Sequence, residues 1–174
     1  MSSGRVKTDV LGHESALQYS PAWAGYSIIS LRVGLGWVFF QTGVSRILDS
    51  TWSSHQFVAG IPEANPFGHL WKEVVASSGW LVDPVFSWGF AVVGAGLLFG
   101  VFIKPSAALG TVLMLLAWST SFTPPGPILT RHLVYVLVLF SLVTFGAGRI
   151  AGLDALIEKH PIVERYPLLR WFLG

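Results

Sequence analysis

Four long apolar stretches constrain the fold of this chain more than any other feature of its sequence. They cover residues 22–45, 84–103, 105–123 and 128–148, and each has about the 20 residues that an α-helix needs to cross a bilayer. Proline-containing breaks separate the last three, because proline cannot continue a helix. The pattern predicts an all-α fold, an integral membrane four-helix bundle in which residues 1–174 form a single domain.

The composition fits a membrane protein and differs from that of a soluble domain. Charged residues make up 11% of the 174 residues, against about 25% in soluble domains. The eight tryptophans suit the aromatic belts that lie at two membrane interfaces. The net charge of +2 is spread along the chain without a basic block, so we expect the lipid bilayer and not nucleic acid as a partner.

Lysines and arginines set the expected orientation. If the four stretches cross in turn, one side of the membrane holds Arg5, Lys7, Lys104, Arg149, Lys159, Arg165 and Arg170. The other side holds Arg46, Lys72 and Arg131. The positive-inside rule then predicts a multi-pass plasma-membrane protein with both termini in the cytoplasm.

Two polar regions lie outside the predicted spans. Residues 46–83 form an extracytoplasmic loop, and because structureless loops of this length are uncommon, we expect it to contain short helices lying on the membrane surface. Residues 149–174 form a cytoplasmic tail, whose stretch 153–174 mixes charges with leucines and aromatic residues. This mixture predicts an amphipathic segment along the inner leaflet.

The cysteine and histidine content limits the chemistry open to the chain. Without cysteine, thiol–disulfide exchange, thiolate nucleophiles, iron–sulfur clusters and cysteine-bound zinc are excluded. His55 and His69 have no recognised metal-ligand spacing, and His132 is the only histidine in or beside a span. We therefore expect neither a metal site nor a haem with two histidine ligands.

The first apolar stretch contains one charged residue, Arg32. At about 100° per residue, Gly36, Phe39, Gly43 and Arg46 fall on the same helix face as Arg32. A charge at the bilayer centre costs at least about 2.5–3.5 kcal/mol, so this face is expected to point into the bundle. Its glycines would let another helix or a flat ligand approach closely.

The sequence leaves the partner of Arg32 open. The spans contain no Asp or Glu, so the candidates are backbone carbonyls, Tyr135, bound water, or a ligand oxygen such as a quinone carbonyl. Either Arg32 binds a ligand directly, or it fixes helix packing or extends its guanidinium to the cytoplasmic interface.

Arg46 ends the first span, and Arg131 and His132 begin the fourth, all on the predicted outer side. If these helix ends are neighbours, two guanidinium groups and an imidazole converge there. Guanidinium groups suit oxyanions, and His132 could relay a proton near neutral pH. The alternative is interfacial anchoring by both arginines and a helix-start hydrogen bond by His132.

Three motifs, taken in order, resemble the DoxD/DoxX family of membrane proteins. They read "LRVGLGWVFFQTGVSRILD", "GAGLLFGVFIKPSAALGTVLML" and "RHLVYVLVLFSLVTFGAGRIAGLDALI", and they lie within residues 30–157. The residues at matching motif positions are Arg32, Gly43, Arg46, His132, Gly148, Arg149 and Asp154. The length and the long outer loop are more similar to DoxD, a subunit of thiosulfate:quinone oxidoreductase, than to the shorter DoxX proteins.

The resemblance implies oxidation of thiosulfate to tetrathionate, with electrons passed to membrane quinone and with a partner subunit or a homo-oligomer. The predicted site then has Arg46, Arg131 and Arg32 binding the small oxyanion, His132 as the catalytic residue, and Arg32, Trp37 and Tyr135 binding the quinone. The alternative function is a non-catalytic membrane subunit that anchors or assembles a partner protein. A solute carrier is a third possibility, which the nearly non-polar spans disfavour.

Overall fold

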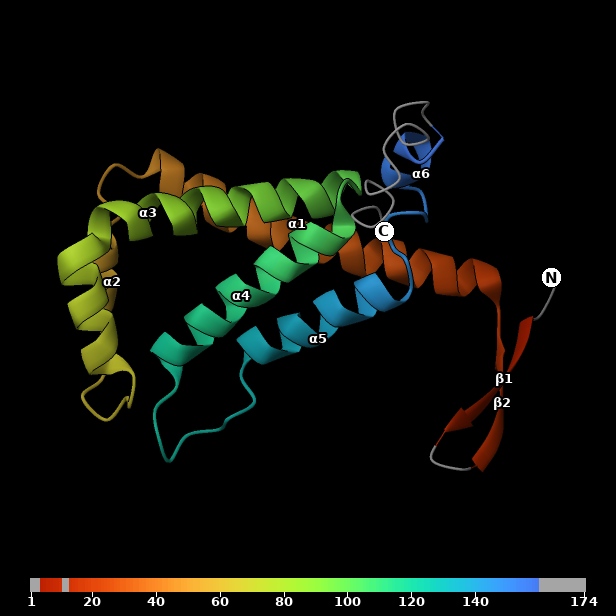
Figure 1. Cartoon of the computed structure of the whole chain (residues 1–174), viewed down its shortest axis with the longest axis horizontal. Helices are drawn as coiled ribbons and strands as arrows, with labels where there is room; N and C mark the ends of the chain where they lie inside the picture. Colours follow the sequence, from red (N-terminus) through yellow and green to blue (C-terminus); the bar gives the residue numbers. More distant parts are fainter. Residues whose placement is uncertain (1–3, 11–12, 160–174) are drawn as a thin grey trace.

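The computed structural model describes residues 4–10 and 13–159 of the chain (Figure 1). Its elements in chain order are β1 (Gly4–Val10), β2 (His13–Tyr19), α1 (Pro21–Leu48), α2 (Ser54–Ala59), α3 (Gly68–Phe99), α4 (Ile103–Ser121), α5 (Arg131–Thr144) and α6 (Asp154–Ile157). The predicted all-α fold is confirmed for residues 20–159, and the membrane four-helix bundle stays a prediction. An antiparallel hairpin of β1 and β2, with Gly4 paired to Tyr19, was not predicted.

The four longest helices form two antiparallel pairs. Figure 1 shows α1 beside α3 and α4 beside α5, with the pairs close together where α3 turns into α4 and spread apart at the opposite end. We call the first of these the inner end and the second the outer end. The α2 helix lies at the outer end, and α6 lies at the inner end.

Glycines allow the backbones of α1 and α3 to touch. A Cβ on Gly43 of α1 would overlap the backbone of Ala91, and a Cβ on Gly94 of α3 would overlap the backbone of Phe40. Small residues at helix crossings permit this close approach. The predicted role of Gly43 on the inward face of the first helix is therefore confirmed.

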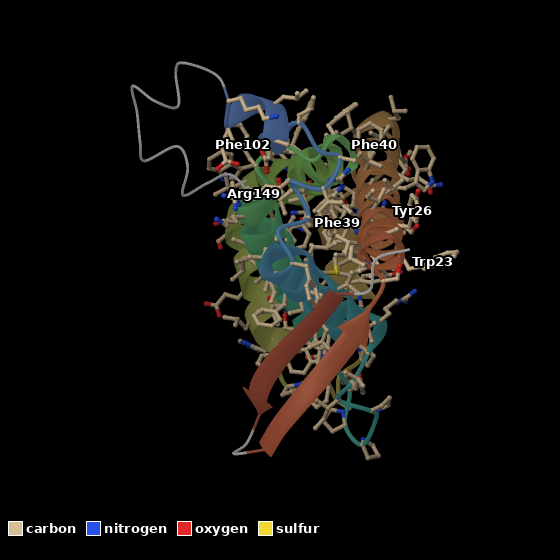
Figure 2. The ribbon with its side chains drawn as sticks, turned by 90° about the vertical axis from the view of Figure 1, so that its right-hand side faces the viewer. Trp23, Tyr26, Phe39, Phe40, Phe102 and Arg149 are labelled. Atoms are coloured by element: carbon tan, nitrogen blue, oxygen red, sulfur yellow. The ribbon has the colours of Figure 1, made fainter. Side chains whose placement is uncertain are left out.

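One apolar core receives side chains from all four of these helices. Its buried members are Leu35, Phe39, Phe90, Val93, Leu97, Ile103, Ala107, Leu113, Met114, Leu139, Leu142 and Ala147. Figure 2 shows Phe39 lying among the helices, whereas Trp23 and Tyr26 of α1 point away from them. This core fixes the relative positions of the helix ends that form the candidate site.

The helix bounds differ from the predicted spans mainly in α3. This helix begins at Gly68, so the second half of the predicted outer loop is helical and continuous with the predicted second span. Ser78 interrupts it with non-helical backbone angles (φ −135°, ψ 22°), and Pro84 lies inside it. Within the described part of the chain, α1 and α3 are the two helices long and apolar enough to cross a membrane.

The predicted outer loop and tail are only partly as expected. The loop contains one short helix, α2, and the first turns of α3. Asn65 fastens it to the end of α4, because its amide donates to the carbonyls of Ser119 (3.0 Å) and Thr120 (2.9 Å). Of the predicted amphipathic segment 153–174, α6 forms the start, and residues 160–174 lie outside the described residues.

Candidate functional site

A cavity of about 500 Å³ lies at the outer end, where the two helix pairs spread apart. We call it the outer cavity. Its polar and aromatic lining residues are Phe39, Thr42, Arg46, Phe57, Phe90, Thr120, Ser121, Arg131, His132 and Tyr135. Its volume is within the range of small-molecule sites, which is about 300–1,000 Å³.

Arg46 reaches the outer cavity from the last turn of α1, where two aromatic rings hold its guanidinium. Its Cζ atom lies 4.9 Å from the ring centre of Trp52 and 4.8 Å from that of Phe90. Both distances are within the about 6 Å of a cation–π interaction. Its Nη1 atom is buried and has no hydrogen-bond partner among the described residues. The side chain is therefore fixed in place with a donor still to be satisfied.

Arg131 and His132 reach the same cavity from the start of α5. The Nδ1 atom of His132 lies 3.3 Å from the Ser121 hydroxyl and 3.4 Å from the Thr130 hydroxyl. Thr130 precedes the helix but provides no side-chain cap for its amide groups. The first turn of α5 thus adds free donors and the positive end of the helix dipole to the side of the cavity that carries Arg131.

No carboxylate lines the outer cavity among the described residues. Two acidic residues of the predicted outer loop have other contacts: Asp49 accepts hydrogen bonds from the backbone and hydroxyl of Thr51, and Asp83 accepts one from the Ser54 backbone. The hydrogen bonds from Thr51 lower the pKa of Asp49 and keep it ionised. The described part of the chain thus lines the cavity with two guanidinium groups and places no carboxylate beside them.

Aromatic rings form the deeper wall of the cavity. The ring centre of Phe39 lies 5.4 Å from that of Phe90 and 6.5 Å from that of Tyr135. Phe39 is 1% exposed, so this wall is continuous with the core. The cavity therefore combines a cationic rim with an apolar floor, an arrangement suited to a small polar ligand or to the polar end of a flat one.

Arg32 lies at the opposite, inner end, where its guanidinium binds backbone carbonyls of the protein. Its side chain is 3% exposed, and its guanidinium donates to the carbonyls of Ala147 (2.6 Å), Ile150 (3.0 Å) and Ala151 (3.1 Å). These carbonyls belong to the turn that follows α5. These hydrogen bonds support the interpretation in which Arg32 is satisfied by backbone carbonyls and fixes helix packing.

Asp154 was missed by the sequence reasoning as a neighbour of Arg32. It is fully buried, and its carboxylate accepts hydrogen bonds from the backbone amides of Phe102 (2.7 Å) and Ile103 (3.2 Å). It also interacts electrostatically with Arg32. Asp154 follows the last predicted span, so the absence of acidic residues within the spans gave no sign of it. The glycine-rich segment before Asp154 was the sequence feature that could have indicated a tight turn back to the helices.

The structure brings together some of the predicted site residues and separates others. Arg46, Arg131 and His132 line one cavity, and Tyr135 lines it with them. Arg32 is at the inner end. Trp37 is 57% exposed, on the face of α1 that points away from the bundle. Arg32, Trp37 and Tyr135, the residues predicted to bind quinone, therefore do not form one site.

Metal-ligating groups give no second candidate site. Among the described residues, no group of three or more histidine, aspartate or glutamate side chains is placed to hold a metal ion. His55 instead packs its ring against Gly79 of α3, where a Cβ would lie 2.6 Å from its Nε2 atom.

Comparison with known proteins identifies one relative and assigns no activity. The chain is 30% identical over 153 residues to an uncharacterized protein of Haemophilus influenzae, and the alignment covers 85% of this chain and 91% of the relative. No family model matches the chain. No solved structure matches it either.

Proposed function

The chain belongs to the same family as the uncharacterized Haemophilus influenzae protein, and we propose that it is a multi-pass membrane protein whose outer cavity binds a small oxyanion. We further propose, from the resemblance to DoxD, that it serves as a membrane subunit of a quinone-linked oxidoreductase that oxidises thiosulfate. The observation that carries this proposal is the convergence of Arg46, Arg131 and His132 on a cavity that no carboxylate of the described residues lines.

The outward faces of the helices support the membrane part of the proposal. Large apolar side chains are exposed along all four long helices: Leu31, Val33, Trp37 and Val38 on α1, Leu81, Val85, Trp88 and Val92 on α3, Leu109, Val112 and Leu115 on α4, and Val134, Leu137 and Phe140 on α5. A soluble monomer rarely exposes a contiguous apolar surface of this kind. In a bilayer these faces would contact lipid, with the inner end in the cytoplasm.

Topology can be tested directly because the chain contains no cysteine. Glu63→Cys lies in the outer loop and Glu158→Cys lies just after α6, and both sites replace polar residues away from the core. In intact cells, a membrane-impermeant maleimide should label Glu63→Cys and leave Glu158→Cys unlabelled until the membrane is opened. The reverse pattern, or equal labelling of both, would contradict the proposed orientation.

The chemistry of the cavity supports an oxyanion as ligand. Guanidinium groups bind oxyanions through paired, charge-assisted hydrogen bonds, and the side chains of Arg46 and Arg131 both line the cavity. In the proposed reaction, two thiosulfate ions each lose one electron and join through a new sulfur–sulfur bond. Quinone accepts the two electrons and two protons, and His132 is placed to transfer a proton at the cavity rim.

The proposed position of the quinone differs from the one that the sequence predicted. The three residues expected to bind it do not converge, and we place the quinone ring in the outer cavity because Tyr135, one of the three, lines it. There Tyr135 offers a hydroxyl, and Phe39 and Phe90 offer aromatic surface. Arg32 is not required for this arrangement.

Anion binding and turnover should be measured separately. With the purified chain in nanodiscs, thiosulfate should raise the melting temperature, and a soluble quinone analogue should be reduced when thiosulfate is present. Arg46→Gln and Arg131→Gln should each weaken thiosulfate binding about tenfold or more, because each removes charge-assisted hydrogen bonds. Lys72→Gln is the matched control, since Lys72 lies in the first turns of α3 at the outer end but does not line the outer cavity.

The results of these measurements distinguish a quinone-linked oxidoreductase, an anion-binding protein without this activity, and a membrane subunit that anchors a partner. Binding without quinone reduction, with any co-purifying partner retained, would overturn the oxidoreductase proposal and leave the anion site. Absence of both would overturn the anion site and favour a membrane subunit that anchors a partner. Equal loss in all three variants would assign the effect to folding or to general surface charge.

A further inference from the structure

A second, much smaller chamber of about 30 Å³ lies behind Arg46. Arg46 and Thr120 line both this chamber and the outer cavity, so they form part of the wall between the two. The rest of the chamber wall is mostly apolar and includes Trp71 and Phe86 of α3. A polar atom that faces this space has few partners available from the protein.

Two buried polar atoms belong to residues of this wall and have no hydrogen-bond partner among the described residues. They are the Nη1 atom of Arg46 and the hydroxyl oxygen of Ser54. Ser54 is 3% exposed, and its backbone amide is already bonded to Asp83 at 2.8 Å. Because a buried polar group without a partner costs about 1–3 kcal/mol, two such groups on one chamber indicate that something in the chamber binds them.

We propose that the chamber binds a single water molecule that bridges Arg46 and Ser54. A water needs about 10–15 Å³ and two to four polar partners, and the chamber exceeds the first requirement without room for a larger ligand. Thr120 can complete the set, because its hydroxyl donates to the Ala117 carbonyl (2.8 Å) and keeps its oxygen free to accept.

Charge decides between water and a small anion. Arg46 alone would favour a halide, but the Asp83 carboxylate sits directly against the Ser54 backbone. That negative charge opposes an anion bound to the Ser54 hydroxyl and leaves a neutral donor and acceptor unaffected. Water can accept a hydrogen bond from Arg46 and donate one to Thr120, which a halide cannot do.

The bound water gives Arg46 a fixed orientation. The rings of Trp52 and Phe90 restrain the guanidinium, and the water holds the Nη1 side of it away from the outer cavity. The remaining N–H groups are then presented to the cavity in one direction. The water is bound in the resting protein, whichever ligand the outer cavity binds.

A crystal structure of the full chain at a resolution that shows ordered water provides the direct test. One density peak within hydrogen-bond distance of both Arg46 Nη1 and Ser54 Oγ is the expected result. A chamber without density would overturn the proposal. Crystals grown in bromide supply the charge test, because an anomalous peak in the chamber would show that the occupant is a halide.

The sign of a stability change gives a second test that needs no map. If the water is present, Ser54→Ala removes one of its partners and should lower the melting temperature by about 2–4 °C. If the chamber is dry, the same change removes a hydroxyl without a partner and should raise it. Ser77→Ala, at an exposed serine of α3, is the control. A rise, or no difference from the control, would overturn the proposal.

Discussion

At the inner end, Arg32 binds the segment after the C-terminus of α5, and the neighbouring Asp154 binds the N-terminus of α4. The Arg32 guanidinium donates to the carbonyls that follow α5, and the Asp154 carboxylate accepts from the backbone amides that begin α4. Gly100 and Gly152 make room, since a Cβ on either would lie within 3 Å of Arg32 Nη1 (2.8 and 2.9 Å). One pair of charges therefore joins α1, α4, α5 and the segment after the last long helix.

Removing the Arg32 charge should destabilise the whole fold. Arg32→Leu leaves three carbonyls without a donor and Asp154 without its neighbouring cation, and breaking a buried charge pair typically costs about 3–5 kcal/mol. Arg32→Lys should recover only part of this, because an ammonium cannot reach three carbonyls in the fork geometry of a guanidinium. Denaturant unfolding in a fixed detergent measures both.

Arg149→Gln is the matched control for that experiment. Arg149 lies in the same turn as Ala147 and Ile150, whose carbonyls bind Arg32. It forms an ion pair with Glu158 at 3.1 Å, but its side chain is 55% exposed. Exposed pairs contribute about 0–1 kcal/mol, so the variant should unfold close to the wild type. A loss for Arg32→Leu no larger than this one would contradict the structural role assigned to Arg32.

Substitutions at Asp154 should separate hydrogen bonding from charge. Asp154→Asn keeps an oxygen that can accept from Phe102 or Ile103, whereas Asp154→Ala removes the acceptor of the part-buried Phe102 amide and of the buried Ile103 amide. We expect the alanine variant to lose more stability than the asparagine variant, by about 1–3 kcal/mol. Melting curves of the two proteins at neutral pH measure the difference. Equal losses would show that the charge beside Arg32 is the whole effect.

The sequence predicted local structure well where hydrophobic periodicity and helix-breaking residues alone determine it. The apolar stretches 22–45 and 105–123 agree with α1 and α4 to within a few residues. The glycine face of the first helix was also foreseen, because helical spacing alone places Gly43 beside Arg32. Such features follow from 3.6 residues per turn and need no knowledge of neighbours.

The features that the sequence did not predict depend on contacts between distant segments. The start of α3 at Gly68 lies within a polar stretch, and packing of its first turns on Val58 and Ile61 stabilises it there. The Asp154 contact requires the chain to return to α4 after the last long helix. Arg46 and Arg131 converge only if the ends of α1 and α5 are neighbours, and the sequence alone does not show which helices are neighbours.

Close contact between α1 and α3 should make Gly43 and Gly94 intolerant of any side chain. Gly43→Ala and Gly94→Ala would each place a methyl group inside the backbone of the other helix, so the helices must separate. We expect losses of about 1–3 kcal/mol, as for other overpacked sites. Gly34→Ala is the control, because nothing lies within 4 Å of its Cβ position. There, the better helix propensity of alanine should add up to about 1 kcal/mol.

Asn65 should control how tightly the outer loop covers the cavity. It is 5% exposed, its amide donates to the carbonyls of Ser119 and Thr120, and its side-chain oxygen accepts from the Phe67 amide at 2.7 Å. Asn65→Ala removes all three bonds, so we expect faster amide hydrogen exchange across residues 60–68 and a modest loss of global stability. Glu63→Ala, at an exposed position of the same loop, should leave exchange unchanged.

The same variant links the loop to the cavity that it borders. Gly60, Ile61 and Pro62 line the outer cavity and lie within the segment that Asn65 fastens to α4. If loosening this segment opens the cavity, Asn65→Ala should speed both association and release of a bound anion, because part of the wall would then move freely. Stopped-flow binding of thiosulfate measures both rates. Unchanged rates alongside faster hydrogen exchange would show that the loop is not the route by which a ligand enters.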